Sequence, residues 1–334
     1  MDGTWLPYFW AVLIAFSIIV YVLLDGFDLG VGILFGTTRD APARATMMNA
    51  IAPFWDGNET WLILIGASLF GAFPVIYAVF LPAFYLPVAL MLLGLIFRGV
   101  AFEFRYRTER MRWLWDLGFF LGSLIVAFVQ GAAIGAMAQA LAVTERQFSG
   151  GSFDWLSPFS VFCGVGLAVG YALLGASWLA LKTSGHLQEW AYRRIGWLSL
   201  GVLVFLAGAF SFVLHNQPLV MERWSAQPSL LVFPFYGLIA AIGLVAGWWR
   251  RGPDGLCFAM SVVIFIAAFL TLVVSFWPYM IPFSLTIEEA AAPTASLEFL
   301  YYGAGIVVFP AVLIYTVAVY WIFRGKVRDD ADYR

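Results

Sequence analysis

Apolar stretches of about twenty residues, separated by short polar segments, recur along the whole chain. A helix needs about 20 mostly apolar residues to cross roughly 30 Å of hydrocarbon. Each stretch therefore predicts a membrane-spanning helix. Nine spans are predicted, at 8–36, 57–77, 79–98, 113–138, 157–181, 196–215, 229–249, 255–278 and 299–323. The second and third are the least obvious, because no charge separates them, and a tight turn near residues 74–82 is expected to join them.

Basic residues provide an independent test of this topology, because Lys and Arg collect in short cytoplasmic loops of membrane proteins. With the N-terminus outside, 16 of the 18 Lys and Arg residues fall on the inner side. Only Arg146 and Arg223 fall outside. The pattern predicts nine spans with a periplasmic N-terminus and a cytoplasmic C-terminus.

Composition agrees with a membrane protein. The 334 residues are 63% hydrophobic and 11% charged, whereas about 25% of the residues of a soluble domain are charged. The fold class predicted is therefore an all-α, polytopic membrane protein with a single membrane domain over residues 1–334. The net charge of −2 and the lack of a basic tail give no indication of nucleic-acid binding.

Four acidic residues lie in or beside the first two spans. Asp25 and Asp28 are three residues apart in the first span, and Asp56 and Glu59 repeat that spacing where the second span begins. Residues three apart share one helical face, and ionisable residues within a membrane are costly enough to suggest a function. For Asp56 and Glu59 a capping box at a helix N-terminus is an equally simple interpretation. Gly26 and Gly30, four residues apart, favour close packing of another helix against this span.

Few residues could ligate a metal or a haem. His186 is expected in an inner loop and His215 at an outer helix end, so a bis-histidine haem cannot be built from them, although one His with a Met ligand stays open. Cys163 and Cys257 are expected near opposite membrane faces, which argues against a disulfide, and two cysteines make no metal motif. No cofactor is predicted to be ligated by this chain.

Four motifs resemble the second subunit of cytochrome bd-type quinol oxidases. They are DGFDLGVG in the first span, IAPFWDGNETWL at the start of the second, the GAFP that follows it and RGVAFEFR at the end of the third. The resemblance is dense over residues 20–115 and rests on hydropathy beyond them. The motif WDGNETWL and the length of 334 residues resemble the cyanide-insensitive branch of this family more than its other branch. In the other branch, Gln is expected at the position of Glu59.

The resemblance implies a fold and a partner. In that family the nine helices form two four-helix bundles and a peripheral helix, which would be residues 1–138, 157–278 and 299–323. A sister subunit, subunit I, carries the haems, of types b and d, and the quinol site, and this chain would pack beside it in the bacterial inner membrane. The complex transfers electrons from quinol to O₂ and takes protons from the cytoplasm.

The resemblance also implies a role for the acids. Asp56, with Trp55 beside it, would donate protons into a path, and Asp25 would be the second acid of that path. We expect Asp28 and Glu59 to share this role and Arg98 and Glu103 to form a structural ion cluster. A structural quinone in this chain and small accessory subunits stay open.

Two other functions fit the sequence. One is a proton-coupled transporter, with prolines in residues 74–87 as helix breaks around a substrate, although nine spans do not divide into equal inverted halves. The other is a purely structural subunit without a proton role.

Overall fold

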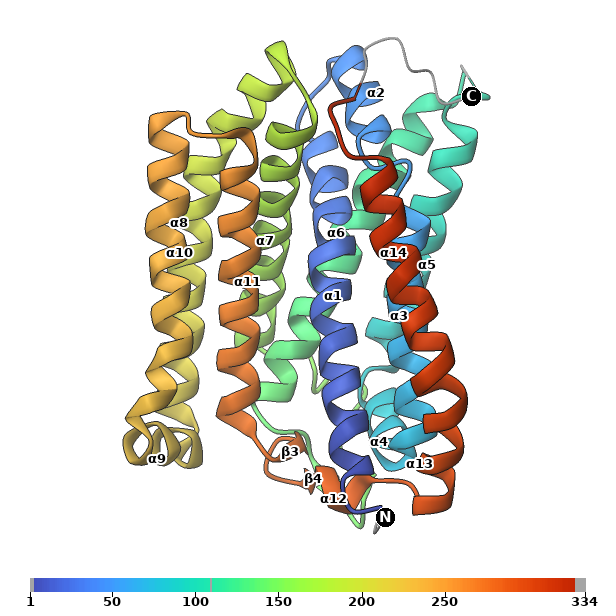
Figure 1. Ribbon diagram of the computed structural model, residues 1–334, viewed down its shortest axis with the longest axis vertical. Helices are drawn as coiled ribbons and strands as arrows, with labels where there is room; N and C mark the ends of the chain where they lie inside the picture. Colours follow the sequence, from blue (N-terminus) through green and yellow to red (C-terminus); the bar gives the residue numbers. More distant parts are fainter. Residues whose placement is uncertain (1–2, 109, 328–334) are drawn as a thin grey trace.

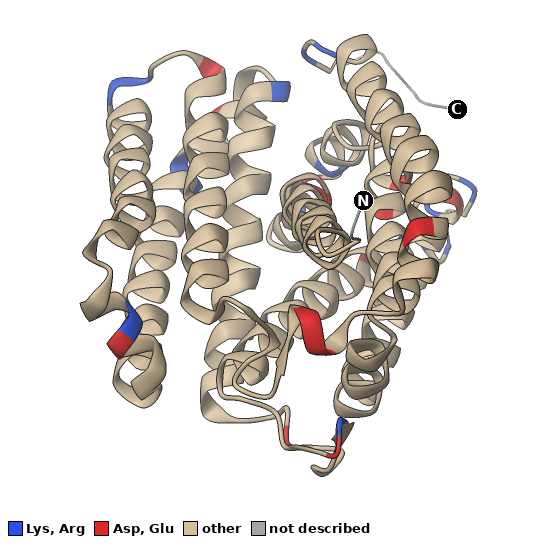
Figure 2. Ribbon diagram, turned by 60° about the horizontal axis from the view of Figure 1, so that its bottom comes forward, with Lys and Arg blue, Asp and Glu red and all other residues tan. Residues whose placement is uncertain are grey.

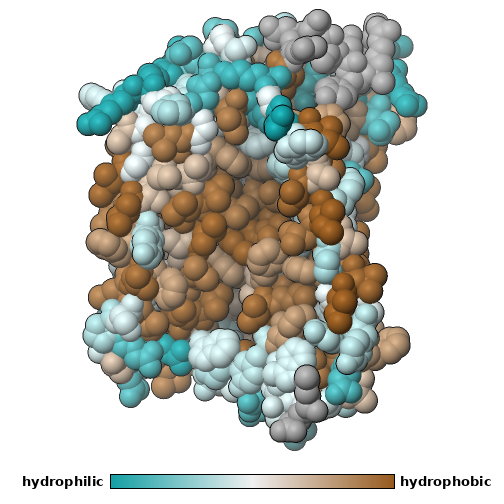
Figure 3. Space-filling view, viewed as in Figure 1, coloured by the Kyte–Doolittle hydropathy of each residue, from teal (hydrophilic) through white to brown (hydrophobic). Residues whose placement is uncertain are grey.

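Long, roughly parallel helices make up the computed structural model, which describes residues 3–108 and 110–327 (Figure 1). Within these residues, eight helical segments are long and apolar enough to cross a bilayer. Figure 3 shows apolar side chains over the middle of one face and hydrophilic side chains at both ends. The prediction of an all-α protein with many spans is confirmed. The eight are α1 Leu6–Phe35, α5 Tyr85–Phe104, α6 Arg112–Ala138, α7 Pro158–Lys182, α8 Gly185–Asn216, Pro228–Arg250, which includes α10 Val232–Arg250, α11 Asp254–Phe276 and Thr294–Ile322.

The predicted second and third spans differ from the structure. Helix α3, Trp55–Ala72, is followed by a separate short helix α4, Pro74–Ala83, where a tight turn was expected. Pro74 suits the first turn of a helix, and Phe73 before it leaves helical geometry at φ −135° and ψ 63°. Helix α5 consequently begins six residues later than predicted. Since α3 begins with a polar turn and is not among the eight, the ninth span stays a prediction.

The last predicted span is a continuous helical segment of three parts. Helix α13, Thr294–Leu300, passes into a π-helical segment, Tyr301–Val308, and then into α14, Phe309–Ile322. Proline lacks a backbone N–H, so Pro310, the second residue of α14, cannot complete the preceding α-helical turn. The π-helical segment lies directly before this break.

Short helices and strands lie in the segments between the long helices. Within α12, Glu289 accepts hydrogen bonds from the backbone and hydroxyl of Thr286 at 2.9 and 2.7 Å. These bonds lower the pKa of the exposed Glu289 carboxyl. The remaining elements are α2 Ala41–Asn49, β1 Val143–Thr144, β2 Gln147–Phe148, α9 Pro218–Ala226, a 3₁₀ turn at Pro228–Leu231, β3 Tyr279–Ile281, β4 Leu285–Thr286 and α12 Ile287–Ala290. β1 pairs with β2 and β3 with β4, each antiparallel.

Helices α1 and α7 approach each other very closely. A Cβ atom on Gly30 would overlap the backbone carbonyl of Tyr171, and one on Gly175 would overlap the backbone of Gly30. A Cβ on Gly26 would lie 2.7 Å from the ring of Tyr171. The expectation that Gly26 and Gly30 serve helix packing is confirmed. This contact fixes α1, and with it Asp25 and Asp28, against the centre of the protein.

Basic residues of the described chain gather at the end that holds α2 (Figure 2). Arg146 and Arg223 lie toward the opposite end, as the sequence predicts, and Arg328 and Arg334 lie outside the described residues. We call this end the basic end. It carries Arg39, Arg44, Arg105, Arg107, Arg110, Arg112, Lys182, Arg193, Arg194, Arg250, Arg251, Arg324 and Lys326.

Candidate functional site: a buried carboxyl–guanidinium cluster

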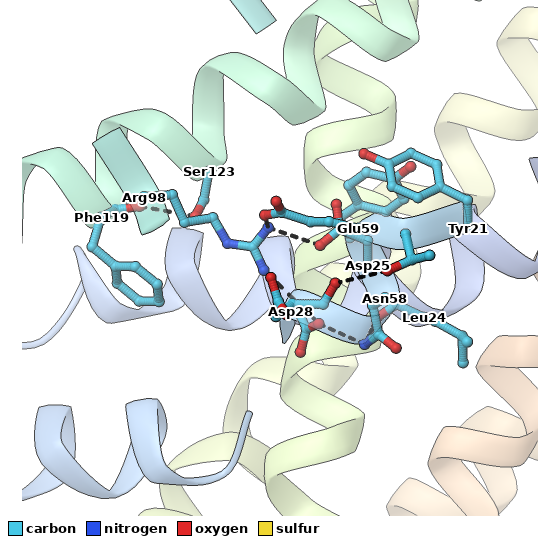
Figure 4. Close-up of polar contacts among 12 residues, drawn as sticks. Tyr21, Leu24, Asp25, Asp28, Asn58, Glu59, Arg98, Phe119 and Ser123 are labelled. Carbon is cyan, nitrogen blue, oxygen red and sulfur yellow. Dashed lines mark hydrogen bonds and ion pairs between the residues drawn. The ribbon is translucent and has the colours of Figure 1, made fainter. Parts of the chain in front are cut away.

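A fully buried arginine is the centre of the site. Nη1 of Arg98, on α5, donates to Oδ1 of Asp25 at 2.8 Å and to Oε1 of Glu59 at 2.9 Å. Its Nη2 lies 3.8 Å from Oδ2 of Asp28 (Figure 4). Helices α1, α3 and α5 thus each contribute charged groups to one point. We call Asp25, Asp28, Glu59 and Arg98 the Arg98 cluster.

Acidic groups outnumber the guanidinium in the Arg98 cluster. Asp25 and Asp28 have side chains that are 0% exposed, as is that of Arg98. One oxygen of each aspartate, Oδ2 of Asp25 and Oδ1 of Asp28, has no hydrogen-bond partner among the protein atoms. Burying charges that are not fully paired is expensive, and a carboxyl group avoids that cost when it binds a proton. The arrangement is therefore chemically suited to taking up and releasing protons.

An asparagine and a tyrosine extend the cluster to the last helix. Nδ2 of Asn58 donates to Oδ2 of Asp28 at 2.7 Å and to the carbonyl of Leu24 at 3.2 Å. The hydroxyl of Tyr320, on α14, donates to Oδ1 of Asn58 at 3.1 Å. Sequence reasoning missed both residues. Asn58 could have been found because it adjoins Glu59, whereas nothing in the sequence connects Tyr320 to these acids.

The exposed fraction of the acidic side chains falls stepwise from the first turn of α3 into the Arg98 cluster. Asp56 is exposed, the side chain of Glu59 is 23% exposed, and Asp25 is fully buried. Asp56 and Glu59 are three residues apart and share one face of α3. The ring of Trp55 stacks on that of Phe102, with ring centroids 4.9 Å apart. The four acids form a series that connects the surface with the interior.

Two interpretations of these residues are wrong. The N-cap of α3 is Phe54 and makes no side-chain cap, so Asp56 and Glu59 do not form a capping box. The carboxyl of Glu59 turns to Arg98 because a guanidinium is a stronger partner than a backbone N–H. Glu103 does not join Arg98 in an ion cluster. It is 67% exposed and lies 3.6 Å from Arg107, one turn further along the chain.

A second ion group lies nearer the basic end. Asp116 on α6 accepts from Arg44 at 2.8 Å and from Arg105 at 2.5 Å. Both guanidinium groups also lie over the ring of Phe35, at 4.7 and 5.3 Å from its centroid. The group ties α2, α5 and α6 together. Sequence reasoning did not anticipate it, because Arg44 lies 72 residues from Asp116 in the chain.

The two histidines cannot act together. His186 and His215 are exposed at opposite ends of α8, which places them about 44 Å apart at 1.5 Å per residue. Cys163 and Cys257 are free and buried. Among residues 3–108 and 110–327, no group of three or more His, Cys, Asp and Glu side chains is arranged to hold a metal ion.

Comparison with known proteins identifies the family. Residues 6–323 match the family of cytochrome bd terminal oxidase subunit II. The chain belongs to this family. It is 30% identical to cytochrome bd-I ubiquinol oxidase subunit 2 of Escherichia coli K12, over 99% of this chain and 97% of the relative. It is also 30% identical to cytochrome bd ubiquinol oxidase subunit 2 of Bacillus subtilis 168, over 95% and 96%.

A solved structure shares the fold of this subunit II. The bd oxidase from Geobacillus thermodenitrificans matches with a TM-score of 0.76 and 16% identity, over 95% of this chain and 97% of that one. The resemblance drawn from the four motifs is confirmed. The protein is a multi-pass inner-membrane subunit of a quinol oxidase complex, an oxidoreductase, and family membership replaces the transporter alternative.

Replacing His186 and His215 together by Ala should leave the haem absorption spectrum of the purified complex unchanged. Both side chains are exposed at helix ends and too far apart to ligate one haem. The measurement is the reduced-minus-oxidised difference spectrum per mole of complex. Loss of a haem band would show that one of them is an axial ligand.

Proposed function

We propose that the Arg98 cluster is the proton-loading site of this subunit II and that Asp56 is its entrance. The observation that carries the proposal is the stepwise burial of four acids, from the exposed Asp56 through the 23% exposed Glu59 to the fully buried Asp25 and Asp28. Reduction of O₂ to water consumes protons, and the basic end, which lies on the cluster's side, is the end expected in the cytoplasm.

Each step has a chemical reason. The exposed carboxyl of Asp56 exchanges protons with water. Glu59 lies on the same face of α3 and contacts Arg98, so it links the surface to the interior. Arg98 holds Asp25 and Glu59 on one nitrogen, which keeps the two acceptors close together. Asn58 fixes Asp28 at the far side of the guanidinium. Protons would pass from this cluster to the haem-bearing subunit I.

Replacing Asp56 by Asn should lower the quinol oxidase turnover of the assembled complex by about tenfold or more, because proton transfer by a positioned side chain contributes about 10²- to 10⁴-fold. The amide keeps the size of the side chain but cannot carry a proton. Oxygen consumption per haem is the measurement, so that assembly defects do not enter the result. Glu59→Gln should act in the same direction.

Glu103→Gln is the matched control, since Glu103 is an exposed acid of the same half of the protein that does not contact the cluster. Its turnover should stay within about twofold of the wild type, as expected for an exposed pair. Normal turnover in a fully haem-loaded Asp56→Asn complex would refute the entrance. Asp56 would then only stabilise the N-terminus of α3 by its negative charge.

The partner and cofactors follow from the family. We infer that subunit I provides haems b and d and the quinol site, since the two histidines of this chain lie at opposite ends of α8 and cannot ligate one haem together. Phospholipid and small accessory subunits would cover the remaining apolar surface. For this chain we infer one membrane domain with the two bundles and peripheral helix expected from the family.

An apolar cavity of about 640 Å³ supports a structural quinone in this chain. It lies among α1, α5, α6, α7 and α8, and the side chains around it are nearly all apolar. An isoprenoid tail has the matching chemistry, because ligand sites are concave and mostly apolar. The lining exposes no polar atoms, so the cavity would hold the apolar tail of the quinone.

A reporter that is active only in the cytoplasm should be active when fused after Arg334, and a reporter active only outside should work in the 139–156 loop. This outcome follows from nine spans with the N-terminus in the periplasm and from the basic end facing inward. Enzyme activity of paired fusions in intact cells is the measurement. With the N-terminus outside, a 139–156 fusion active only in the cytoplasm together with an Arg334 fusion active only outside would contradict the ninth span at α3.

A further inference from the structure

A chain of three buried polar side chains lies next to the Arg98 cluster. Nε2 of Gln130, on α6, donates to the hydroxyl of Tyr21, on α1, at 2.8 Å. The hydroxyl of Tyr171, on α7, donates to Oε1 of Gln130 at 2.7 Å. Tyr21 is 4% exposed and Tyr171 0%. The function proposed above uses none of these three residues.

The hydrogen bonds of this chain all run in one direction. Tyr171 donates to Gln130, and Gln130 donates to Tyr21. The hydroxyl oxygen of Tyr21 is therefore an acceptor on the Gln130 side, and a tyrosine hydroxyl has a single hydrogen to donate. That hydrogen must point away from Gln130. The orientation of Tyr21 is thus determined by two residues on other helices.

Tyr21 lies one helical turn before Asp25 on the same face of α1 (Figure 4). Side chains four residues apart on a helix are neighbours on its surface. Oδ1 of Asp25 is bound to Arg98, whereas Oδ2 is buried and has no partner among the protein atoms. The other charged groups that face Asp25 are Asp28 and Glu59. Tyr21 is the neutral donor on this side.

We propose that Tyr21 is a positioning residue for Asp25, oriented by Gln130 and Tyr171, and that its hydroxyl hydrogen is directed at Oδ2. The inference rests on the proposed function, in which Asp25 accepts protons. One carboxyl oxygen is held by Arg98, and the Tyr21 hydroxyl would face the other, which has no hydrogen bond in the structure. A donor that faces the free oxygen would keep the carboxyl in place each time a proton arrives or leaves.

The same chain does not offer protons a route beyond Asp25. Gln130 turns an N–H toward Tyr21, and an amide N–H cannot accept a proton from a hydroxyl. A proton on the Tyr21 side therefore has no acceptor in the direction of Tyr171. The arrangement positions Asp25 and at the same time closes the cluster toward α7.

The test uses Tyr21→Phe and Gln130→Met in the complete oxidase complex. Each should lower turnover per haem by about three- to tenfold. The double variant should be no slower than the worse single one, because residues that act in one network are not additive. The infrared band of the Asp25 carboxyl, identified by its loss in Asp25→Asn, should shift in reduced-minus-oxidised spectra of both single variants.

Ser261→Ala is the matched control, because it removes a buried hydrogen bond to Ser177 that lies apart from the cluster. It should change neither turnover nor the band. An Asp25 band that is absent, or unshifted in Tyr21→Phe, would overturn the positioning role. If Asp25→Asn is slow while that band is unshifted, this inference alone fails. If Asp25→Asn turns over normally, the proposed proton-loading site fails.

Discussion

Replacing Arg98 by Leu should largely prevent assembly of the oxidase complex. Arg98 is the only cation bound to Asp25, Asp28 and Glu59 in the described structure. Removing one partner of a buried ion pair costs about 3–5 kcal/mol, because the remaining charge is left without compensation. A cost of about 1.4 kcal/mol changes an equilibrium constant about tenfold. We therefore expect the amount of haem-containing complex recovered from membranes to fall by more than about tenfold.

Two variants separate charge from geometry at this position. Arg98→Lys keeps the charge but lacks the planar fork that reaches several carboxyls, so assembly should be partly retained. Arg98→Leu combined with Asp25→Asn removes one acid along with the cation and should recover part of the lost complex. Full assembly of Arg98→Leu alone would contradict the role of Arg98 as the organising charge.

Replacing Gly30 by Ala should be nearly as damaging, although it adds a single methyl group. The new Cβ would overlap the backbone carbonyl of Tyr171, and backbone cannot rotate away as a side chain can. Overpacking commonly costs about 1–3 kcal/mol and occasionally more, and here α1 must move away from α7. The expected result is a loss of most of the assembled complex, measured as haem per membrane protein.

Gly66→Ala is the matched control for this substitution. Gly66 lies within α3, and an added Cβ there meets no atom within 4 Å. Alanine should be neutral or should stabilise the helix by up to about 1 kcal/mol. Equal loss of complex in Gly30→Ala and Gly66→Ala would show that the close approach of α1 and α7 is not the cause.

The sequence predicted the features that depend on local pattern. Apolar stretches predicted most of the helices, and the i, i+3 spacing placed Asp25 and Asp28 on one face. It also brought Asp56 and Glu59 to one helix start. These are properties of neighbouring residues, which hydropathy and helical periodicity describe well.

Contacts between distant segments could not be predicted. Tyr320 meets Asn58 across 262 residues, and no periodicity records which helices are neighbours. The grouping of Arg98 with Glu103 was wrong because nearness in sequence was taken for nearness in space. Residues five apart on a helix do not face each other, and Glu103 turns outward to Arg107. The division at Phe73 was missed because α4 is as apolar as a span.

The composition of the Arg98 cluster also constrains how the protein is made. A ribosome delivers Asp25 and Asp28 to the insertion machinery about seventy residues before Arg98. Placing an aspartate at the centre of a nascent transmembrane helix costs about 2.5–3.5 kcal/mol. Until Arg98 is made, the two acids of the first helix therefore have no cation to pair with. Tyr320 arrives last, so the hydrogen-bond network at Asn58 is completed only when synthesis of the chain is nearly finished.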